Sequence, residues 1–234
     1  MTRLGEIITD KSLRLMARGL AAGRLQTIAS GVENIPAQGP ALLVARHYHH
    51  LFDGLALFAA LPRPFHIVVT LDWARNRRTK YFMAALNRIA RWPMILRPDA
   101  LFQNGERQRS LFTRKDVTRY QRRAIRQAVD LLGEGRLLVV FPEGYPNVDP
   151  TYTPKQAADA FLPFKRGFVA ILDRAERRLA APVPALPVGF YYAKEKPWIA
   201  HVKVGPPILR NLFSCKDEFI AFIEGEVKRL SSPE

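Results

Sequence analysis

The chain has 234 residues, of which 48% are hydrophobic and 24% are charged. This length and balance predict one folded domain with a full core and exclude bulk disorder. Lys and Arg number 36 against 21 Asp and Glu, so the formal net charge is +15. Twenty-six of these cations are arginines, whose guanidinium groups suit phosphate. The expected partner is anionic: a nucleic acid, a phospholipid surface or a phosphorylated substrate.

The cysteine count and the hydropathy further narrow the class of protein to which the chain can belong. A single cysteine, Cys215, excludes a disulfide framework and a cysteine-based metal site, and favours a reducing compartment. No stretch approaches 18 uncharged apolar residues, so we expect neither a membrane-spanning helix nor a secretory segment. If the protein meets a membrane, we expect it to lie on the surface.

In chain order, residues 1–30 are predicted as an amphipathic segment with a helix from 3 to about 28, which suits either a membrane surface or a core. A turn-rich connector follows at 31–40. Strands are then expected at 41–45, 65–71, 94–96, 136–141, 183–190 and 199–204, and helices at 53–61 (with Asp53 as N-cap), 79–90, 114–132, 167–179 and 216–230. This alternation predicts a single α/β domain over 1–234, with a mostly parallel central sheet flanked by helices.

The positive charge is concentrated in the middle of the chain. Residues 70–136 hold 16 Lys and Arg against 6 Asp and Glu, a net of +10 out of the +15. Part of this run is the solvated face of a helix. A positive region beside reactive loops would also raise the local concentration of an anionic substrate.

Three of the five histidines, His47, His49 and His50, lie between the strand at 41–45 and the following helix, close to Asp53. Open α/β sheets place reactive groups in such loops. Imidazole titrates near neutrality, and a carboxylate on its second nitrogen fixes the tautomer, so this loop suits a general base. Histidine and aspartate also bind zinc, but no further His or Cys lies nearby, so we expect no metal.

A second candidate loop, Phe141, Pro142, Glu143 and Gly144, follows the strand at 136–141. Pro and Gly around a glutamate predict a tight turn that presents backbone amides and a carboxylate to a polar ligand. Lys165 and Arg166 at the start of a helix form a candidate phosphate site. Arg97 ends the short strand at 94–96 and is expected to point into the same crevice. The hydrolase serine elbow and the glycine-rich nucleotide-binding motifs do not occur in the sequence.

In order and spacing, these motifs resemble the glycerolipid acyltransferase family typified by 1-acylglycerol-3-phosphate acyltransferase. The family carries an N-H-x4-D loop, a short strand ending in arginine, an F-P-E-G loop, an F-K-x-G motif and a V-P-x-x-P-V strand. The matching residues here are Arg46-His47 to Asp53, Ile95-Leu96-Arg97, Phe141–Gly144, Phe164–Gly167 and Val183–Val188, and VKVGPPI at 202–208 matches the closing strand. The similarity runs from about Gly31 to Arg210.

One departure concerns the histidine. Five residues separate His47 from Asp53 instead of four, and the four-spaced position is Tyr48, a poor base. We interpret this as a one-residue insertion with His47 kept as the base, while His49 and His50 stay open as alternates.

The resemblance implies an acyltransferase in which His47, oriented by Asp53, activates the hydroxyl of a lysophospholipid or glycerol phosphate. The acyl donor would be a thioester co-substrate, acyl-CoA or acyl-carrier protein, and no resident cofactor is implied. By the same resemblance, Arg97, Glu143, Lys165 and Arg166 would bind the acceptor's phosphoglycerol end, with the Phe141–Gly144 loop beside them. The protein would associate with the anionic inner face of the cytoplasmic membrane.

Two other functions fit the sequence. A nucleic-acid-binding module would explain the arginines, although the aromatics lie mainly in apolar runs and no reading motif occurs, so nucleic acid is not the expected partner. A catalytically inactive anionic-lipid-binding relative would explain the altered histidine spacing.

Overall fold

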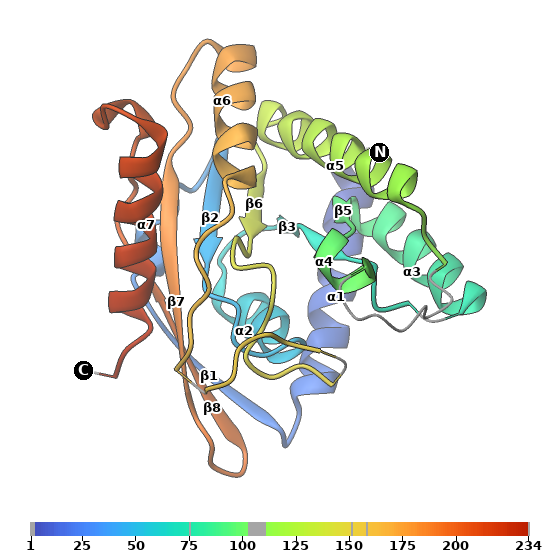
Figure 1. The fold of residues 1–234 in the computed structure, drawn as a ribbon. Coiled ribbons are helices and arrows are strands. Elements are labelled where there is room, and N and C mark those ends of the chain that lie inside the picture. Colours follow the sequence, from blue (N-terminus) through green and yellow to red (C-terminus); the bar gives the residue numbers. More distant parts are fainter. Residues whose placement is uncertain (1–2, 75, 103–110, 151, 158, 234) are drawn as a thin grey trace.

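The computed structural model describes residues 3–74, 76–102, 111–150, 152–157 and 159–233 (Figure 1). Its centre is a six-stranded sheet in the order β1-β8-β7-β2-β6-β3. The strands are β1 Leu25–Ser30, β2 Ala41–Ala45, β3 Phe65–Ile67, β6 Leu137–Val140, β7 Ala185–Ala193 and β8 Trp198–Val204. All neighbouring pairs are parallel except β7–β8. The predicted α/β domain with a mostly parallel sheet is confirmed.

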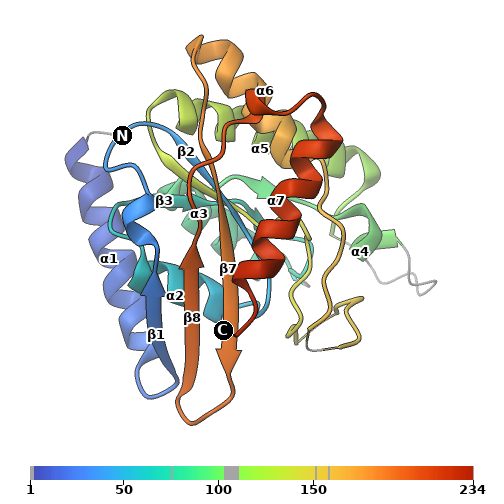
Figure 2. The same cartoon turned by 90° about the vertical axis from the view of Figure 1, so that its left-hand side faces the viewer.

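Helices cover both faces of this sheet (Figures 1 and 2). On one face lie α1 Arg3–Ala21 and α2 Phe52–Ala60, and on the other lie α5 Arg114–Gly133, α6 Gly167–Leu179 and α7 Lys216–Leu230. Neighbouring residues of a strand point to opposite faces, so in β2 Leu43 joins the core under α2 while Leu42 joins the core under α6 and α7. A strand buried on both faces is apolar at every position, as Ala41–Ala45 is.

A smaller lobe stands beside the main sheet. It contains the two-stranded parallel sheet of β4 Val69–Thr70 and β5 Met94–Ile95, with α3 Arg77–Ala90 and α4 Pro98–Phe102. Its core includes Leu71, Leu96, Phe112 and Val117. The strand predicted at 65–71 is therefore divided: β3 joins the main sheet and β4 joins this lobe. Short 3-10 helices at Val32–Asn34 and Arg210–Leu212 complete the fold.

The prediction of one helix from 3 to about 28 is wrong at its end. The helix α1 stops at Ala21, Gly23 adopts a positive φ of 68°, and Leu25–Ser30 forms β1 at the sheet edge. Helix α1 packs on α2, because Arg14 donates hydrogen bonds to the carbonyls of Phe58 and Leu61. Within the described ranges, no helix carries an apolar run long enough to cross a bilayer.

Candidate active site

The predicted site residues meet at the carboxyl edge of the parallel strands. His47 follows β2, and Glu143 follows the neighbouring strand β6. Both side chains therefore emerge at the edge where open α/β sheets hold their ligands. A direct hydrogen bond joins the two loops: the backbone N–H of His47 donates to Oε1 of Glu143 at 2.9 Å.

The imidazole of His47 is paired with the carboxylate of Asp53. Nδ1 of His47 lies 2.8 Å from Oδ2 of Asp53, and the ring stacks on Phe141 with 4.5 Å between centroids. No described residue bonds the other ring nitrogen, Nε2, and the side chain keeps 18% of its surface exposed. The extra residue in the loop thus leaves His47 within reach of Asp53, in the geometry expected of an oriented general base.

Asp53 is almost fully buried and its oxygens are saturated with donors. Oδ2 also accepts the backbone N–H of Tyr48, and Oδ1 accepts the N–H of His49 and the hydroxyl of Tyr192, at 2.7, 3.0 and 2.6 Å. Burial, together with the neighbouring Asp53 carboxylate, raises the pKa of Tyr192, which keeps this hydroxyl a donor. Sequence reasoning missed Tyr192 because it lies on β7, 139 positions after Asp53.

The bonds of Asp53 correct one prediction about the helix that follows. Asp53 does not cap α2: the N-cap position is Leu51, and the carboxylate instead bonds amides that precede the helix. The amides of Leu51 and Phe52 donate to Nδ1 of His49 at 3.2 Å, so this imidazole takes the capping role. Burial, with the neighbouring His50 as the next cause, lowers the pKa of His49 to about 4.

Neither alternate histidine bonds Asp53 through its ring. His49 is buried with its Nδ1 occupied as described, and the exposed His50 donates from Nδ1 to the carbonyl of Val148 at 3.2 Å. In the described part of the chain, no group of three or more His, Cys, Asp and Glu side chains is placed to hold a metal ion. His47 is the ring that the geometry favours.

The structure gives Glu143 a different place from the predicted one. We expected it to bind the acceptor, but it is fully buried, and its oxygens accept the N–H groups of His47 and Leu162 and pair with Nζ of Lys155 at 2.6 Å. Lys155 also donates to the carbonyl of His47 at 2.8 Å. Burial lowers the pKa of Lys155, and the charge of Glu143 opposes that shift. This pair ties the histidine loop to the segment after β6; the sequence gives no signal for Lys155.

Arg97 lies beneath the second loop and is only 7% exposed. It donates to Oδ2 of Asp72 at 2.6 and 2.9 Å and to the carbonyl of Gly144 at 2.8 Å, and its guanidinium lies 4.0 Å from the centre of the Tyr145 ring. Lys165 lies on the other side of Gly144, half-exposed and 3.7 Å from Asp99. Arg97 and Lys165 therefore both contact the 141–144 turn.

Arg166 does not join them. Its side chain is 76% exposed and pairs with Asp217 on α7 at 2.8 Å. In the turn itself, Gly144 has a φ of 78° and its N–H donates to the carbonyl of Phe141, while Pro142 is buried and accepts the N–H of Lys165. The turn is tight, as predicted, but its carboxylate faces inward.

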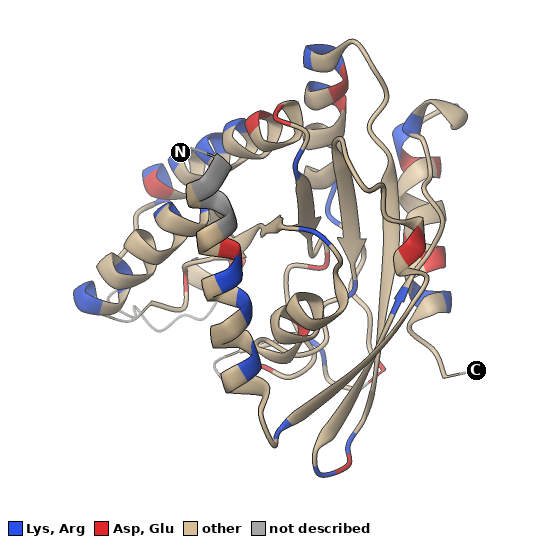
Figure 3. Ribbon diagram, turned by 180° about the vertical axis from the view of Figure 1, so that it is seen from behind, with Lys and Arg blue, Asp and Glu red and all other residues tan. Residues whose placement is uncertain are grey.

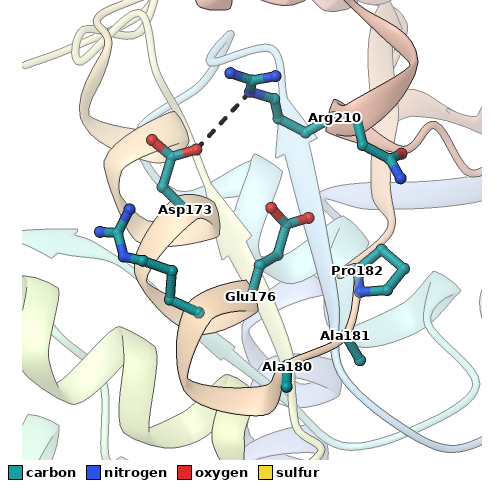
Figure 4. Close-up of a pocket in the computed structure, with 8 residues that line it drawn as sticks. Asp173, Glu176, Ala180, Ala181, Pro182 and Arg210 are labelled. Atoms are coloured by element: carbon teal, nitrogen blue, oxygen red, sulfur yellow. Dashed lines mark ion pairs between the residues drawn. The ribbon is translucent and has the colours of Figure 1, made fainter.

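A cavity of about 450 Å³ lies elsewhere (Figure 4). It is lined by α6, the 180–182 segment and the 3-10 helix at Arg210–Leu212. Residues 180–182 precede the amino end of β7, which runs parallel to β2, so the cavity and His47 occupy opposite edges of the sheet. Its two carboxylates are already engaged: Asp173 pairs with Arg210 at 3.8 Å, and Glu176 accepts the N–H of Val183.

Two comparisons with known proteins give matches to the chain. A family model described as Acyltransferase matches residues 26–191. Among solved structures, the chain is similar to the 1-acyl-sn-glycerophosphate (LPA) acyltransferase PlsC from Thermotoga maritima, with a TM-score of 0.61 and 19% sequence identity, over 94% of this chain and 77% of that one. No curated protein matches the chain closely enough to count as a relative.

Proposed function

The chain belongs to the acyltransferase family, and from this premise we propose that it moves a fatty acyl group from a thioester to the hydroxyl of a lysophospholipid or glycerol phosphate. The observation that carries the proposal is the His47 Nδ1 to Asp53 Oδ2 distance of 2.8 Å, with Nε2 of His47 unbonded by any described residue. The solved PlsC structure, described as that of an LPA acyltransferase, supports the choice of acceptor class.

In the proposed step, Nε2 of His47 takes the proton of the acceptor hydroxyl as its oxygen attacks the thioester carbonyl carbon. The tetrahedral intermediate then expels the thiolate, which receives the proton from the imidazolium. The carbon–oxygen bond replaces the carbon–sulfur bond, and a free thiol leaves. Asp53 holds the ring and stabilises its transient positive charge, as the carboxylate does in a serine protease triad.

The oxyanion of this intermediate needs donors, and we assign them to backbone amides near the Phe141–Gly144 turn. Arg97 and Lys165, which converge on that turn, would attract the phosphate of the acceptor. Glu143 and Lys155 act as positioning residues, since they bond the backbone of His47. The proposed chemistry uses only these groups and the thioester co-substrate, acyl-CoA or acyl-carrier protein, without a resident metal or cofactor.

We further propose that the protein works on an anionic membrane surface at the cytoplasmic face. Its net charge of +15 supports attraction to acidic phospholipids. The exposed face of α1 adds Leu15 and Met16, which are 72% and 50% exposed, with Lys11 and Arg18 among them. This combination is typical of helices that lie in the membrane interface.

Thiol release from an acyl thioester in the presence of lysophosphatidate tests the function. We expect His47→Ala to lower kcat by about 10²- to 10⁴-fold, the usual contribution of a general base. The matched control, His50→Ala, changes an exposed ring of the same loop and should stay near wild type. Repeating the assay with acyl-CoA and with acyl-carrier protein identifies the donor.

Two outcomes would overturn the assignment. Wild-type protein that binds lysophosphatidate but releases no thiol with either donor is a lipid-binding relative, not an enzyme. An active His47→Ala variant beside an inactive His50→Ala variant would move the base to His50.

A further inference from the structure

Helix α3 carries an apolar stripe on its outer side. Tyr81 and Phe82 are each 67% exposed and Ile89 is 57% exposed. With Arg77, Arg78 and Arg88, which are also exposed, they recur at the three-, four- and seven-residue spacings of one helix side. We call these six residues the α3 face.

The inner side of α3 is already occupied. Met83 packs into the core of the small lobe, and Nζ of Lys80 lies 4.3 Å from the centre of the Phe112 ring. The side chains of the α3 face are therefore not needed to pack α3 against the small lobe. Large aromatic side chains that gather on an exposed helix side without a structural role mark an interaction surface.

The chain segment that carries the α3 face is charged with one sign. Between Asp72 and Asp99 the chain has six arginines and one lysine and no acidic residue. Among the described residues, none forms an ion pair with Arg77, Arg78 or Arg88. Helix α1, which contacts α3, also carries cations, so basic residues run along both helices on this side of the molecule (Figure 3).

Trp73, which precedes α3 in the chain, is connected to the candidate active site through a short chain of contacts. Trp73, exposed at the approach to α3, donates from its ring N–H to the carbonyl of Thr70. Its neighbour Asp72 holds Arg97, and Arg97 bonds the Gly144 turn. Trp73 and the proposed phosphate site are thus joined through Asp72 and Arg97.

We propose that the α3 face is a membrane-docking surface that seats on an anionic lipid bilayer, with Trp73, Tyr81 and Phe82 in the headgroup region and the arginines on lipid phosphates. Amphipathic rings favour that depth, and each nearby Lys or Arg strengthens attraction to acidic lipid. The proposal rests on the lipid acceptor proposed above and deepens it: a bilayer in this position presents lysolipid to Arg97 and Lys165.

Two other occupants fit the surface less well. A second copy of the chain would bring the same face across a two-fold axis, so that unpaired arginines would meet arginines. A nucleic acid would satisfy the cations but leave Ile89 and the ring of Phe82 without the apolar surroundings that lipid supplies.

Co-sedimentation with vesicles of phosphatidylglycerol and phosphatidylcholine tests the proposal without requiring catalysis. Tyr81→Ser/Phe82→Ser should lower the partition coefficient about tenfold. Arg77→Gln/Arg78→Gln should lower it by a similar factor, but only on vesicles that contain the anionic phosphatidylglycerol. Fluorescence of Trp73 should be quenched by brominated acyl chains, and a Trp73→Phe variant should lose most of that quenching.

Matched controls lie elsewhere on the surface. Leu212→Ser/Phe222→Ser removes exposed apolar side chains near α7, and Arg122→Gln/Arg123→Gln removes two exposed cations of α5. Both should bind vesicles within about twofold of wild type. Equal losses in test and control variants, or unquenched Trp73 fluorescence in vesicle-bound protein, would overturn the α3 assignment.

The same measurements distinguish a failure of the docking surface from a failure of the proposed function. The α3 variants should keep the wild-type rate on glycerol phosphate, which needs no membrane. A wild type that binds vesicles through α3 but releases no thiol refutes the enzyme and leaves the docking surface. The reverse result, an active enzyme indifferent to α3 changes, refutes the docking surface alone.

Discussion

At the scale of single residues, the donors around Asp53 explain how one carboxylate serves both the loop and the imidazole. Two backbone amides and the Tyr192 hydroxyl fix its position, and the fourth donor is the His47 ring. In the proposed mechanism, a carboxylate held in this way stays in place while the imidazole is charged. The hydroxyl also withdraws negative charge from Asp53, which tunes how strongly the carboxylate stabilises imidazolium.

Tyr192→Phe separates these two effects. Loss of one hydrogen bond to a buried carboxylate should lower kcat by about tenfold. The less neutralised Asp53 should also stabilise the imidazolium more, so the acidic limb of the kcat/KM pH profile should move to higher pH. A purely structural hydroxyl would leave that limb in place. Tyr191→Phe is the control, since this neighbour points to the other side of β7, toward His201.

His49 links the protonation of the loop to the stability of the fold. Its pKa lies near 4 in the folded protein because the ring is buried, against about 6.5 in an unfolded chain. Between these values the unfolded state binds the proton more tightly. The contribution of His49 is therefore complete above pH 6.5 and is lost as the pH falls toward 4, by about 3 kcal/mol in all.

His49→Asn should remove this pH dependence. The asparagine oxygen can accept the amides of Leu51 and Phe52 in place of Nδ1 but does not titrate. We expect the free energy of unfolding, measured by urea at a series of pH values, to fall less steeply between pH 6.5 and 4 in the variant. Parallel curves for the two proteins would show that His49 does not titrate as described.

At the scale of elements, the buried Lys155–Glu143 pair attaches the segment after β6 to the end of β2. Lys155→Met leaves Glu143 buried with an uncompensated charge and should cost about 3–5 kcal/mol of stability in urea unfolding, together with transferase activity. The control is Lys228→Met, which breaks a half-exposed pair with Glu224 and should cost less than 1 kcal/mol. Equal losses in the two variants would contradict a linking role for Lys155.

Elements whose hydrophobic pattern is clear over a few neighbouring residues could be predicted from the sequence. The strands Ala41–Ala45 and Leu137–Val140 are apolar at each position, and α6 starts and ends at the predicted residues, Gly167 and Leu179. The segment Leu25–Ser30 could not be separated from α1, since its apolar spacing suits either a helix or a strand. What makes it a strand is its pairing with β8, more than 170 residues later.

The candidate site likewise contains residues that the sequence predicts and residues that it does not. The pairing of His47 with Asp53 follows from a loop of six residues, and local spacing was enough to predict it. Tyr192 and Lys155 reach the site from distant segments, and no motif indicates them. Glu143 was predicted on the correct loop but on the wrong side of it, since its orientation is decided by Lys155 and by the amide of Leu162.

At the scale of the whole molecule, the proposed chemistry and the proposed docking surface lie in two different regions. The parallel strands bring the candidate catalytic loops to one edge of the sheet, and the small lobe, which carries α3, contacts one of these loops through the bond from Arg97 to the carbonyl of Gly144. Exposed cations act on anionic lipid through water and are screened by salt. The buried pairs around His47 are shielded from that screening, so binding and chemistry should respond differently to ionic strength.

Raising the salt from 0.1 M to 1 M shortens the screening length from about 10 Å to about 3 Å. The apparent KM for lysolipid in phosphatidylglycerol vesicles should therefore rise by at least about tenfold, while kcat at saturating vesicle concentration stays within about twofold. With a monomeric acceptor such as glycerol phosphate, the salt effect on KM should be much smaller, because only the few cations near Arg97 take part. Should kcat on vesicles fall in step with kcat on the monomeric acceptor, salt would be acting on the His47 site itself, and the separation of docking from chemistry would be wrong.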